Sequence, residues 1–589
     1  MTYQFYKKFA RIINARQSRS VILCGNVYDL FRHEGTYLPL IDFLLKKIEH
    51  PNIMQVVYEL NGPIRIEDKQ MLKEAYIAGK AGKSANDIAI ENSLRKLPPK
   101  VDLLKFLDDE FESLLRECQG NATLALQFLR QLTTLSRKYL RNKVGEKVNL
   151  VIIIEAADML LPAGKDIASL NEVDRRRISI VQDWFSDPQF CAGGDAVCLI
   201  AESRSLIHSR VSRLPQVLSV EIPSPNTSER QAFIDWFDYE VDPSIAKLTA
   251  GLSLHAVQQL LAGAKYSGTP ITPDLLVDKV EEYIKGQVGD DVVEFKKPDH
   301  SLTDIVGFSH LKKFLQEELI PRFKASGEHA LPGAAVAGPI GSGKTFIFEA
   351  VAAELGVPVL VLKNIRSQWF GQTDVIFERL RRVLEALEKV IIFVDEADTQ
   401  FGGVGAETHS TERRLTGKIQ AMMSDPKLRG KVTWLLMTAR INLLSADIRR
   451  PGRVGDLIIP ILDPEGNDHV DFVEWVLSSV CDNYDSKERS QIAFLTKGYS
   501  AAGFASLRSN LLAKKSLYPD RFTFDMIEKV VDDHIPPAIG KTREYQRLQA
   551  LLNCTRKSLL PESALFGNIT EAKQQWEKRI IELESEGIR

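Results

Sequence analysis

Gly338-Pro339-Ile340-Gly341-Ser342-Gly343-Lys344-Thr345 is the stretch around which this chain is organised. Its spacing fits the pattern G-x-x-x-x-G-K-[ST], in which glycines let the backbone curl closely around phosphate groups. The apolar run Ala334–Ala337 predicts a buried strand before it, and the helical spacing of apolar residues in Thr345–Leu355 predicts a helix after it. Such a loop presents backbone N–H groups and a helix N-terminus to phosphates. We therefore expect a phosphate-binding loop, with Lys344 near the β- and γ-phosphates and the Thr345 hydroxyl on Mg²⁺.

Length and composition limit the class of protein. A chain of 589 residues exceeds what one hydrophobic core normally organises and predicts about three to five domains. Charged residues make up 26% of the chain and the formal net charge is −2, so no basic excess indicates nucleic-acid binding. No apolar run approaches the length of a membrane span, and we expect no membrane partner.

The cysteines and the N-terminus bear on the compartment. The six cysteines form no C-x-x-C pair and no zinc pattern, which favours a reducing compartment and a cytoplasmic protein. The chain begins with a basic segment whose first acidic residue is Asp29, a composition that transit peptides share. We favour a structural segment, because the amphipathic helix predicted for Phe5–Ile13 leads almost directly into the apolar strand Val21–Cys24 without a cleavable spacer.

Two successive series of short apolar strands alternate with helices, which predicts parallel sheets with helices on both faces. The first series comprises Val21–Cys24, Met54–Tyr58, Asn149–Ile154, Ala196–Ala201 and Leu218–Ile222, with mostly helical residues at 65–145. The second comprises Ala334–Ala337, Val357–Leu362, Val390–Val394, Val432–Met437 and Leu457–Ile461, followed by helices from 465 to about 533. Residues 287–303 are polar, contain a proline, and are interpreted as a linker.

The two series indicate an internal repeat. Residues 153–158 (IIEAAD) mirror 393–398 (FVDEAD), and residues 248–253 (LTAGLS) mirror 495–500 (LTKGYS) in the same order. The first copy lacks the chemistry of the second. After Gly25 there is no further glycine, lysine or Ser/Thr at phosphate-loop spacing, and Ala156 stands where the second copy has Glu396. We therefore expect the first copy not to bind ATP.

Two acidic residues follow the third strand of the second series. Asp395 ends a buried strand, where its carboxylate is expected to hold Mg²⁺ through water, and Glu396 is expected to polarise the attacking water. The alternative role is that of an acidic helix N-cap. Residues 449–453 (RRPGR) lie on a turn before the fifth strand, and they are interpreted as a candidate arginine-finger site or, alternatively, as a solvated basic loop.

Five motifs together carry a family resemblance. They are Asp304–Gly307, the loop 338–345, Phe393–Asp398, Arg450–Arg453 and Gly498–Ala502, and their order resembles that of AAA-type (AAA+) ATPases over about 304–535. The whole chain is similar to bacterial and plastid AAA proteins in which an active module follows a degenerate one. The resemblance implies an α/β fold with a parallel-sheet P-loop module and helical lid, preceded by a degenerate copy. The expected domains are a degenerate α/β domain at 1–230, its lid at 231–290, an active α/β domain at 291–463, a second lid at 464–540 and a helical tail at 541–589.

The resemblance also implies residue roles. Val306 and Gly307 are expected to flank the adenine of ATP, and Phe346 and Ala502 to join the loop residues in the nucleotide site. Arg450 and Arg453 are expected to reach the nucleotide of a neighbouring subunit, which implies a homo-oligomeric ring, usually a hexamer. Trp369 and Phe370 occupy the place of an aromatic central-pore loop; the alternative is a pair of core aromatics.

One position departs from the family pattern. The family usually has Asn after the fourth strand to sense the γ-phosphate, whereas this chain has Ala439 there. Thr438 or Asn442 is the candidate substitute. The departure bears on the rate of hydrolysis more than on nucleotide binding.

These observations support two functions and weigh against a third. The first is an ATP-hydrolysing ring that remodels or threads a protein partner. The second is a nucleotide-gated assembly scaffold with slow turnover, which Ala439 and the degenerate first copy favour. A nucleic-acid motor is disfavoured by the near-neutral charge and by the lack of a basic stripe with interleaved aromatics.

Overall fold

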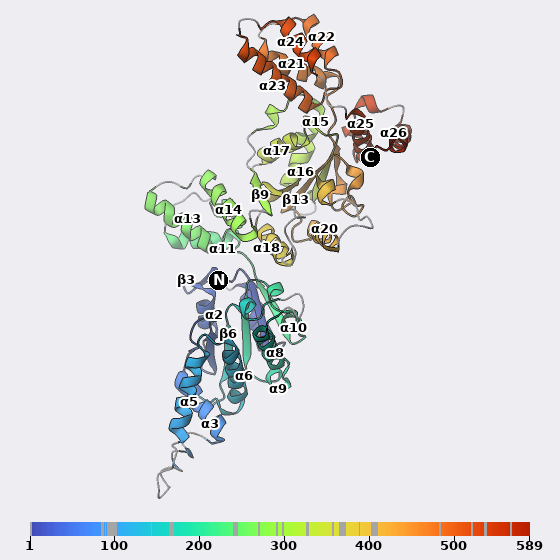
Figure 1. Ribbon diagram of the computed structural model, residues 1–589. Coiled ribbons are helices and arrows are strands. Elements are labelled where there is room, and N and C mark those ends of the chain that lie inside the picture. The colour runs from blue at the N-terminus through green and yellow to red at the C-terminus, as the bar shows by residue number, and fades with distance from the viewer. Residues whose placement is uncertain are drawn as a thin grey trace. The chain divides into compact units, whose positions relative to one another are not determined.

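The computed structural model of the chain is shown in Figure 1. It describes residues 3–83, 87–88, 90, 103–142, 144–163, 170–238, 245–268, 271, 273–289, 292–296, 300–325, 329–355, 359–363, 373–387, 389–401, 410–481, 484–519, 522–534, 539–565 and 568–588. The chain forms two compact units. One contains Met1–Val280 with Gly371–Arg382, and the other contains Glu281–Phe370 with Val383–Arg589.

The first unit is built on a six-stranded sheet in the order β5-β4-β6-β7-β1-β8. All neighbouring strands are parallel except β5, which pairs antiparallel with β4 at the edge. The strands are β1 (Ser20–Gly25), β4 (Ile53–Tyr58), β5 (Arg65–Ile66), β6 (Asn149–Ile154), β7 (Ala196–Ala201) and β8 (Val217–Ile222), and a separate hairpin joins β2 (Leu30–His33) to β3 (Thr36–Pro39). The five strands expected in the first series are therefore confirmed.

Helices cover both faces of this sheet, because its strands are buried on both sides. Val21 and Leu23 pack on the face that carries α1 (Gln4–Asn14) and α2 (Leu40–Ile48), while Ile22 and Cys24 pack on the opposite face. The opposite face carries α3 (Lys69–Ala81), α5 (Leu103–Cys118), α6 (Ala122–Tyr139) and α8 (Glu172–Ser186). Shorter or later helices are α7 (Ala157–Leu160), α9 (Pro188–Cys191), α10 (Ser209–Ser212), α11 (Thr227–Phe237), α12 (Ile245–Leu248), α13 (Leu254–Ser267) and α14 (Pro273–Val288).

Helix α1 confirms the helix expected at the N-terminus. Its apolar face is buried, with Phe5, Phe9 and Ile12 each 4% exposed or less. Phe5 packs edge-on against Phe31. The basic residues of this segment therefore lie on the outer face of a helix that belongs to the core of the first unit.

The second unit is built on a six-stranded sheet in the order β14-β10-β13-β12-β11-β9 (Figure 1). The strands are β9 (Val293–Lys296), β10 (Gly333–Ala337), β11 (Val359–Leu362), β12 (Val390–Val394), β13 (Val432–Thr438) and β14 (Ile458–Pro460). All pairs are parallel except β9 with β11. The expected linker at 287–303 is therefore wrong in part, since an edge strand needs one partner only and the short alternation of Val293–Lys296 suffices for it.

The two sheets have the same strand order. Strands β8, β1, β7, β6 and β4 correspond in turn to β14, β10, β13, β12 and β11, and an antiparallel strand closes the same edge of each sheet. The residue that follows Glu155 after β6 and the residue that follows Asp395 after β12 share a left-handed backbone, with φ of 49° at Ala156 and 47° at Glu396. The internal repeat is thus a repeat of the fold, and each unit is a Rossmann-like parallel-sheet module.

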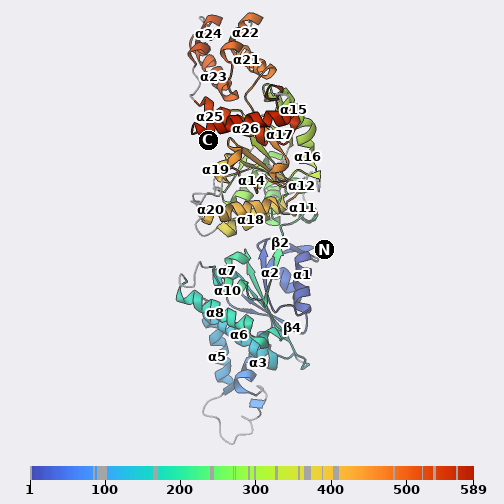
Figure 2. The same ribbon diagram turned by 90° about the vertical axis from the view of Figure 1, so that its right-hand side faces the viewer.

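Helices of the second unit form three groups. Around the sheet lie α15 (Ser309–Phe314), α16 (Ile320–Lys324), α17 (Lys344–Leu355), α19 (Ala397–Gln400) and α20 (Ser410–Met423). Helix α18 (Thr373–Ala386) is divided, since its residues up to Arg382 are grouped with the first unit and the rest with the second. A separate helical cluster contains α21 (Asn467–Val480), α22 (Ser486–Leu495), α23 (Ala501–Leu517) and α24 (Phe524–Asp533), as Figures 1 and 2 both show. The chain then forms a helical hairpin, α25 (Gly540–Asn553) with α26 (Ile569–Ser585), beside the sheet.

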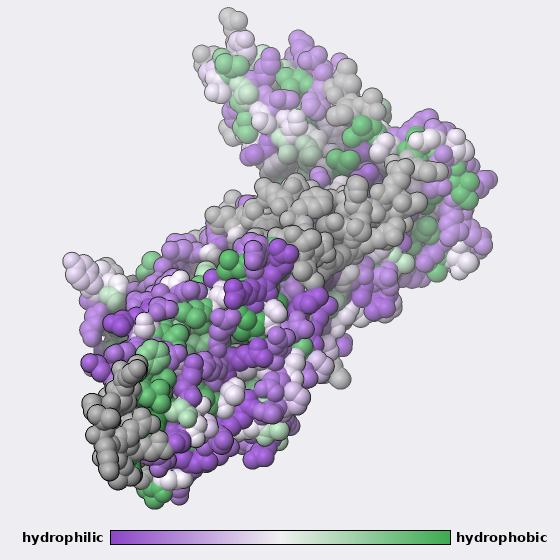
Figure 3. All heavy atoms as spheres, turned by 60° about the horizontal axis from the view of Figure 1, so that its bottom comes forward, coloured by the Kyte–Doolittle hydropathy of each residue, from purple (hydrophilic) through white to green (hydrophobic). Residues whose placement is uncertain are grey.

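The described residues on the face that Figure 3 displays are mainly hydrophilic. On the face that Figure 3 displays, apolar side chains occur in patches among hydrophilic ones. Within the described ranges, no helix combines the length and the apolar character needed to cross a bilayer.

Candidate nucleotide-binding site

The loop Gly338–Thr345 joins β10 to α17, as its sequence context predicts. A Cβ atom at Gly338 would overlap the carbonyl oxygen of Ile461, so this position accepts no side chain. Gly341 and Gly343 have φ of 80° and 88°, values that glycine adopts at little cost. These glycines give the loop its tight curve and leave its backbone open to a ligand.

Lys344 lies inside this curve. Its Nζ donates hydrogen bonds to the carbonyl oxygens of Gly338 and Pro339, both at 2.9 Å. Burial lowers the pKa of Lys344 to about 8, and the carboxylates of Asp395 and Asp398 oppose that shift. An ammonium that is partly stripped of water and held by two neutral carbonyls interacts strongly with an incoming phosphate.

The two candidate magnesium ligands are adjacent. Thr345 Oγ1 donates to Asp395 Oδ2 at 3.1 Å, which brings a hydroxyl from α17 to the carboxyl end of β12. Among the described residues, no group of three or more His, Cys, Asp or Glu forms a metal cage. Oxygen ligands of this kind fit Mg²⁺, which is usually bound by one or two protein oxygens together with phosphate and water.

Glu396 follows Asp395 with its side chain exposed at the pocket. Its backbone N–H donates to Asp395 Oδ1 at 2.8 Å, and its left-handed φ turns the chain sharply between β12 and α19. Ala156 has the same left-handed backbone in the first module, so this turn is a feature of the shared fold. Glu396 is the N-cap residue of α19, but its carboxylate forms no capping hydrogen bond.

These groups line one pocket of about 920 Å³. Away from the phosphate loop the pocket is apolar, with lining residues Ile305, Val306, Phe308, Phe472 and Trp475. Gly307 turns the chain between Val306 and Phe308 with φ of 61°. An apolar wall of this kind suits a planar heterocycle such as a nucleotide base.

The helical cluster closes the pocket over the loop. The backbone N–H of Ala502, in the first turn of α23, donates to the carbonyl of Gly341 at 3.0 Å. Phe346 also lines the pocket, and its ring stacks on His300 with centroids 3.9 Å apart. The structure therefore brings Val306, Phe346, Ala502, Asp395 and Glu396 to one cavity with five loop residues, Ile340, Gly341, Gly343, Lys344 and Thr345. Of the residues predicted to bind the nucleotide, those that do not line it are Gly307, Gly338, Pro339 and Ser342.

The candidate sensor residues have other partners. Thr438 is 1% exposed, and its Oγ1 donates to Asp398 Oδ1 at 2.7 Å. Asn442 Nδ2 donates to the hydroxyl of Tyr545 at 3.3 Å. Ala439 lines the pocket between them and offers no polar side-chain atom.

Arg440 is a pocket residue that sequence reasoning missed. It follows Ala439, and its Nε donates to Asp398 Oδ2 at 2.6 Å. The sequence signal was present, since an arginine directly after the fourth strand falls at the edge where parallel strands present their ligands. Thr542 and Gln546 of α25 also line the pocket, although the spacing of the C-terminal segment gave no sign of it.

The two candidate finger arginines differ in environment. The Arg450 side chain is 55% exposed and lies 3.9 Å from the Asp447 carboxylate. Arg453 is 8% exposed and donates to Ser424 Oγ at 2.8 Å and to the Asp447 carbonyl at 2.9 Å. Arg450 is thus available to another molecule, whereas Arg453 is held within its own unit. Trp369 and Phe370, expected at a central pore, lie outside the described residues.

Three family models match the chain. Residues 2–223 match the N-terminal Rossmann-like domain of AAA+ chaperones, residues 228–289 their second helical domain, and residues 334–460 the ATPase family associated with various cellular activities (AAA). Together they follow the order of the two units, with the AAA model on the pocket just described.

Several curated proteins resemble the chain over part of its length. ATPase family gene 2 protein of Schizosaccharomyces pombe is 28% identical over 36% of this chain and 27% of its own length. A cell division cycle protein 48 homolog of Archaeoglobus fulgidus is 28% identical over 36% of this chain and 30% of its own length. Fidgetin-like protein 1 of Drosophila melanogaster is 25% identical over 42% of this chain and 48% of its own length. The chain thus matches less than half of each of these relatives.

Proposed function

Because this chain belongs to the AAA+ ATPases, we propose that its second module binds ATP with Mg²⁺ and hydrolyses the bond to the γ-phosphate. The α/β domain at 291–463 and the helices at 464–540 form the nucleotide site in this proposal, together with Thr542 and Gln546 of α25. One observation carries it. Lys344, Thr345 and Asp395 meet in a single pocket whose other end is apolar.

Each residue has a distinct role in the proposed reaction. Loop N–H groups and the Lys344 ammonium hold the phosphates, and the apolar end holds the base. Thr345 and Asp395 hold Mg²⁺, which supplies charge to stabilise the transferring phosphoryl group. Glu396 orients the attacking water and accepts its proton. Phosphoryl transfer depends mainly on positioning and charge stabilisation, which this set of groups supplies.

The test uses two variants of the full chain and one control. Lys344→Ala is expected to abolish ATP binding, because the main cation for the phosphates is lost. Glu396→Gln is expected to bind ATP but not to hydrolyse it. Glu155→Gln changes the position in the first module that mirrors Asp395, and it is expected to leave turnover unchanged. Normal turnover by Glu396→Gln would overturn the assignment of the base.

We also propose that the site acts in a homo-oligomeric ring, a hexamer by analogy with the family. Arg450 then reaches the nucleotide of the neighbouring subunit. This role is supported by the exposure of its side chain, which is 55% exposed and lies 3.9 Å from the Asp447 carboxylate. The ring is proposed to remodel or thread a protein partner, and the expectation of no nucleic-acid partner belongs to the same proposal. Co-purification with the Glu396→Gln variant, which keeps ATP, tests for a trapped protein partner.

A nucleotide-gated scaffold is the second candidate. Two features favour it. Ala439 leaves no polar side chain at the usual sensor position, and the first module lacks both the phosphate-loop lysine and a residue equivalent to Glu396. Sedimentation and turnover measured on the same sample separate the two. Assembly that follows ATP binding without appreciable turnover, with or without partners, favours the scaffold; partner-stimulated turnover favours the remodelling ring.

A further inference from the structure

Helix α25 forms a wall of the nucleotide pocket. Thr542 and Gln546, one helical turn apart, both line the pocket, and Gln546 is 3% exposed. The helix lies beyond the residues that the AAA family model matches. The C-terminal hairpin is therefore part of the candidate site and not a separate tail.

Two side chains of α25 hold the phosphate loop at one residue. Gln546 Oε1 accepts a hydrogen bond from the backbone N–H of Ile340 at 3.0 Å, and Arg543 Nε donates to the Ile340 carbonyl at 3.2 Å. Arg543 is in turn paired with the Asp463 carboxylate. Both backbone polar groups of Ile340 thus form hydrogen bonds with α25, to residues that lie 206 and 203 positions away in the sequence.

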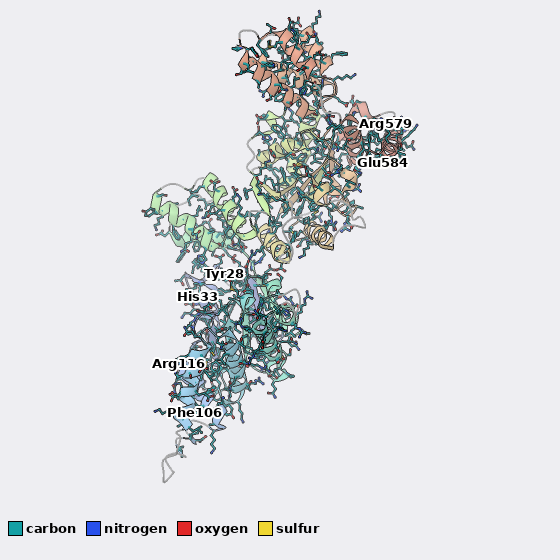
Figure 4. All side chains as sticks on the ribbon, viewed as in Figure 1. Tyr28, His33, Phe106, Arg116, Arg579 and Glu584 are labelled. Carbon is teal, nitrogen blue, oxygen red and sulfur yellow. The ribbon has the colours of Figure 1, made fainter. Side chains whose placement is uncertain are left out.

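The position of Gln546 is fixed by the rest of the hairpin. The neighbouring Tyr545 donates from its hydroxyl to Glu584 of α26 at 2.8 Å, and Arg579 of α26 pairs with Glu544 at 2.7 Å. Figure 4 shows Arg579 and Glu584 close together on α26. At the other end of α25, Thr555 Oγ1 accepts from the Ile458 N–H of β14 at 2.9 Å. Because α25 is anchored on both sides, the Gln546 amide is held rigidly at the pocket.

The amide nitrogen of Gln546 is uncommitted. Its oxygen is bound by Ile340, which fixes the orientation of the amide group. Within the described part of the chain, Nε2 donates to no protein acceptor, although the residue is buried and lines the pocket. Among the described residues, the side-chain atoms that are buried without a partner do not include Nε2, so this donor faces the open pocket, where a ligand can accept its hydrogen bond. Ala439 lines the same pocket with no polar group of its own.

We propose that Gln546 is the residue that distinguishes ATP from ADP, with its Nε2 donating a hydrogen bond to the terminal phosphate of ATP. The inference rests on the proposed function. The C-terminal hairpin would then distinguish ATP from ADP, a role that Ala439 at the end of β13 cannot fill because its side chain has no polar atom. Since Oε1 also holds Ile340, the contact links the presence of the γ-phosphate to the phosphate loop and to α25.

The consequence is a specific loss of ATP affinity. A hydrogen bond to a charged group corresponds to roughly 10- to 100-fold in affinity, and ADP lacks the phosphate that would accept it. Gln546→Ala is therefore expected to weaken ATP binding about ten-fold or more relative to ADP binding. A purely structural contact would change both affinities together.

The experiment measures the dissociation constants of ATP and ADP by titration calorimetry, in the full chain carrying Glu396→Gln so that ATP persists. Gln546→Ala removes both amide functions. Gln546→Glu keeps an acceptor for the Ile340 N–H but replaces the donor by an anionic oxygen, so we expect an even larger selective loss of ATP affinity. Gln549→Ala is the matched control, because Gln549 is also buried on α25 but donates to Tyr545.

The outcomes separate this inference from the function on which it rests. A selective fall in ATP affinity for both Gln546 variants, with Gln549→Ala unchanged, supports the inference. Equal losses for ATP and ADP, or normal affinities for Gln546→Glu, overturn it and leave only a role in holding the loop. If the parent chain bound neither nucleotide, the proposed function would fail first. Gln546→Glu retains the loop contact, so it provides a folded variant even if Gln546→Ala melts early.

Discussion

Asp29 accepts a hydrogen bond on Oδ2 from the backbone N–H of Leu254 at 3.1 Å, across 225 residues of the chain. Its Oδ1 accepts from the N–H of His255 at 3.2 Å. Leu254 begins α13, which corresponds to α23 of the second module, where the Ala502 N–H meets the phosphate loop. In the first module a protein carboxylate thus joins the loop after β1 to the N-terminus of α13, a place where anions are favoured.

This relationship predicts that Asp29 stabilises the first module without any nucleotide. Asp29 is 2% exposed and also accepts from Asn26 Nδ2 and from the Leu30 N–H. Asp29→Ala leaves these donors buried without an acceptor, and we expect a loss of about 2–4 kcal/mol in the free energy of unfolding of that module. Denaturant titration of the full chain provides the measurement.

The matched control is Asp42→Ala, an exposed acidic residue in the first turn of α2. Its expected effect is within about 0.5 kcal/mol. ATP turnover, which we propose for the second module, should survive both changes. Equal stability of Asp29→Ala and the control would show that the carboxylate does not hold α13 in place.

Substitutions of the two candidate finger arginines are predicted to have different effects on turnover and stability. Arg450→Ala is expected to lower turnover by about three orders of magnitude at unchanged melting temperature, because we propose that its exposed side chain acts on another subunit. Arg453→Ala is expected to cost about 2–3 kcal/mol of stability, since it removes a buried cation that donates to Ser424 and Asp447. Turnover and thermal melting of each variant are the two readouts.

Mixed rings test the action of Arg450 in trans. Lys344→Ala subunits have a dead site but an intact Arg450, so adding them to Arg450→Ala subunits should restore turnover. No recovery in mixtures that co-assemble would argue that Arg450 acts only within its own subunit.

The magnesium assignment predicts a difference between two changes at Thr345. Thr345→Ser keeps the hydroxyl that lies 3.1 Å from Asp395 Oδ2 and should keep turnover, whereas Thr345→Val removes it at nearly equal volume. The valine variant should need more Mg²⁺ for half-maximal turnover, because one oxygen ligand is lost. Identical Mg²⁺ dependence of the two variants would remove Thr345 from the metal site.

The sequence was sufficient to predict the strands that are continuous apolar runs, because burial on both faces leaves an unbroken pattern. It was also sufficient to predict that the loop 338–345 joins a strand to a helix and that Asp395 directly follows a strand, because both positions depend on local sequence. The strand β9 escaped prediction, since an edge strand of mixed polarity gives little signal. The contact of Gln546 with Ile340 could not be predicted for a different reason. The two residues are 206 positions apart, and no local sequence pattern relates them.

The last prediction concerns Trp369, which lies outside the described residues. If it grips an extended protein chain at the centre of a ring, Trp offers a large amphipathic surface for contacts that do not depend on sequence. Trp369→Ala should then retain basal ATP turnover and assembly but lose partner-dependent work. A tryptophan in the core would instead leave a cavity that costs about 3–5 kcal/mol, and ATP turnover would fall together with the melting temperature. A melting curve and an ATPase assay on this one variant decide between the two, since a large drop in both contradicts a role in threading.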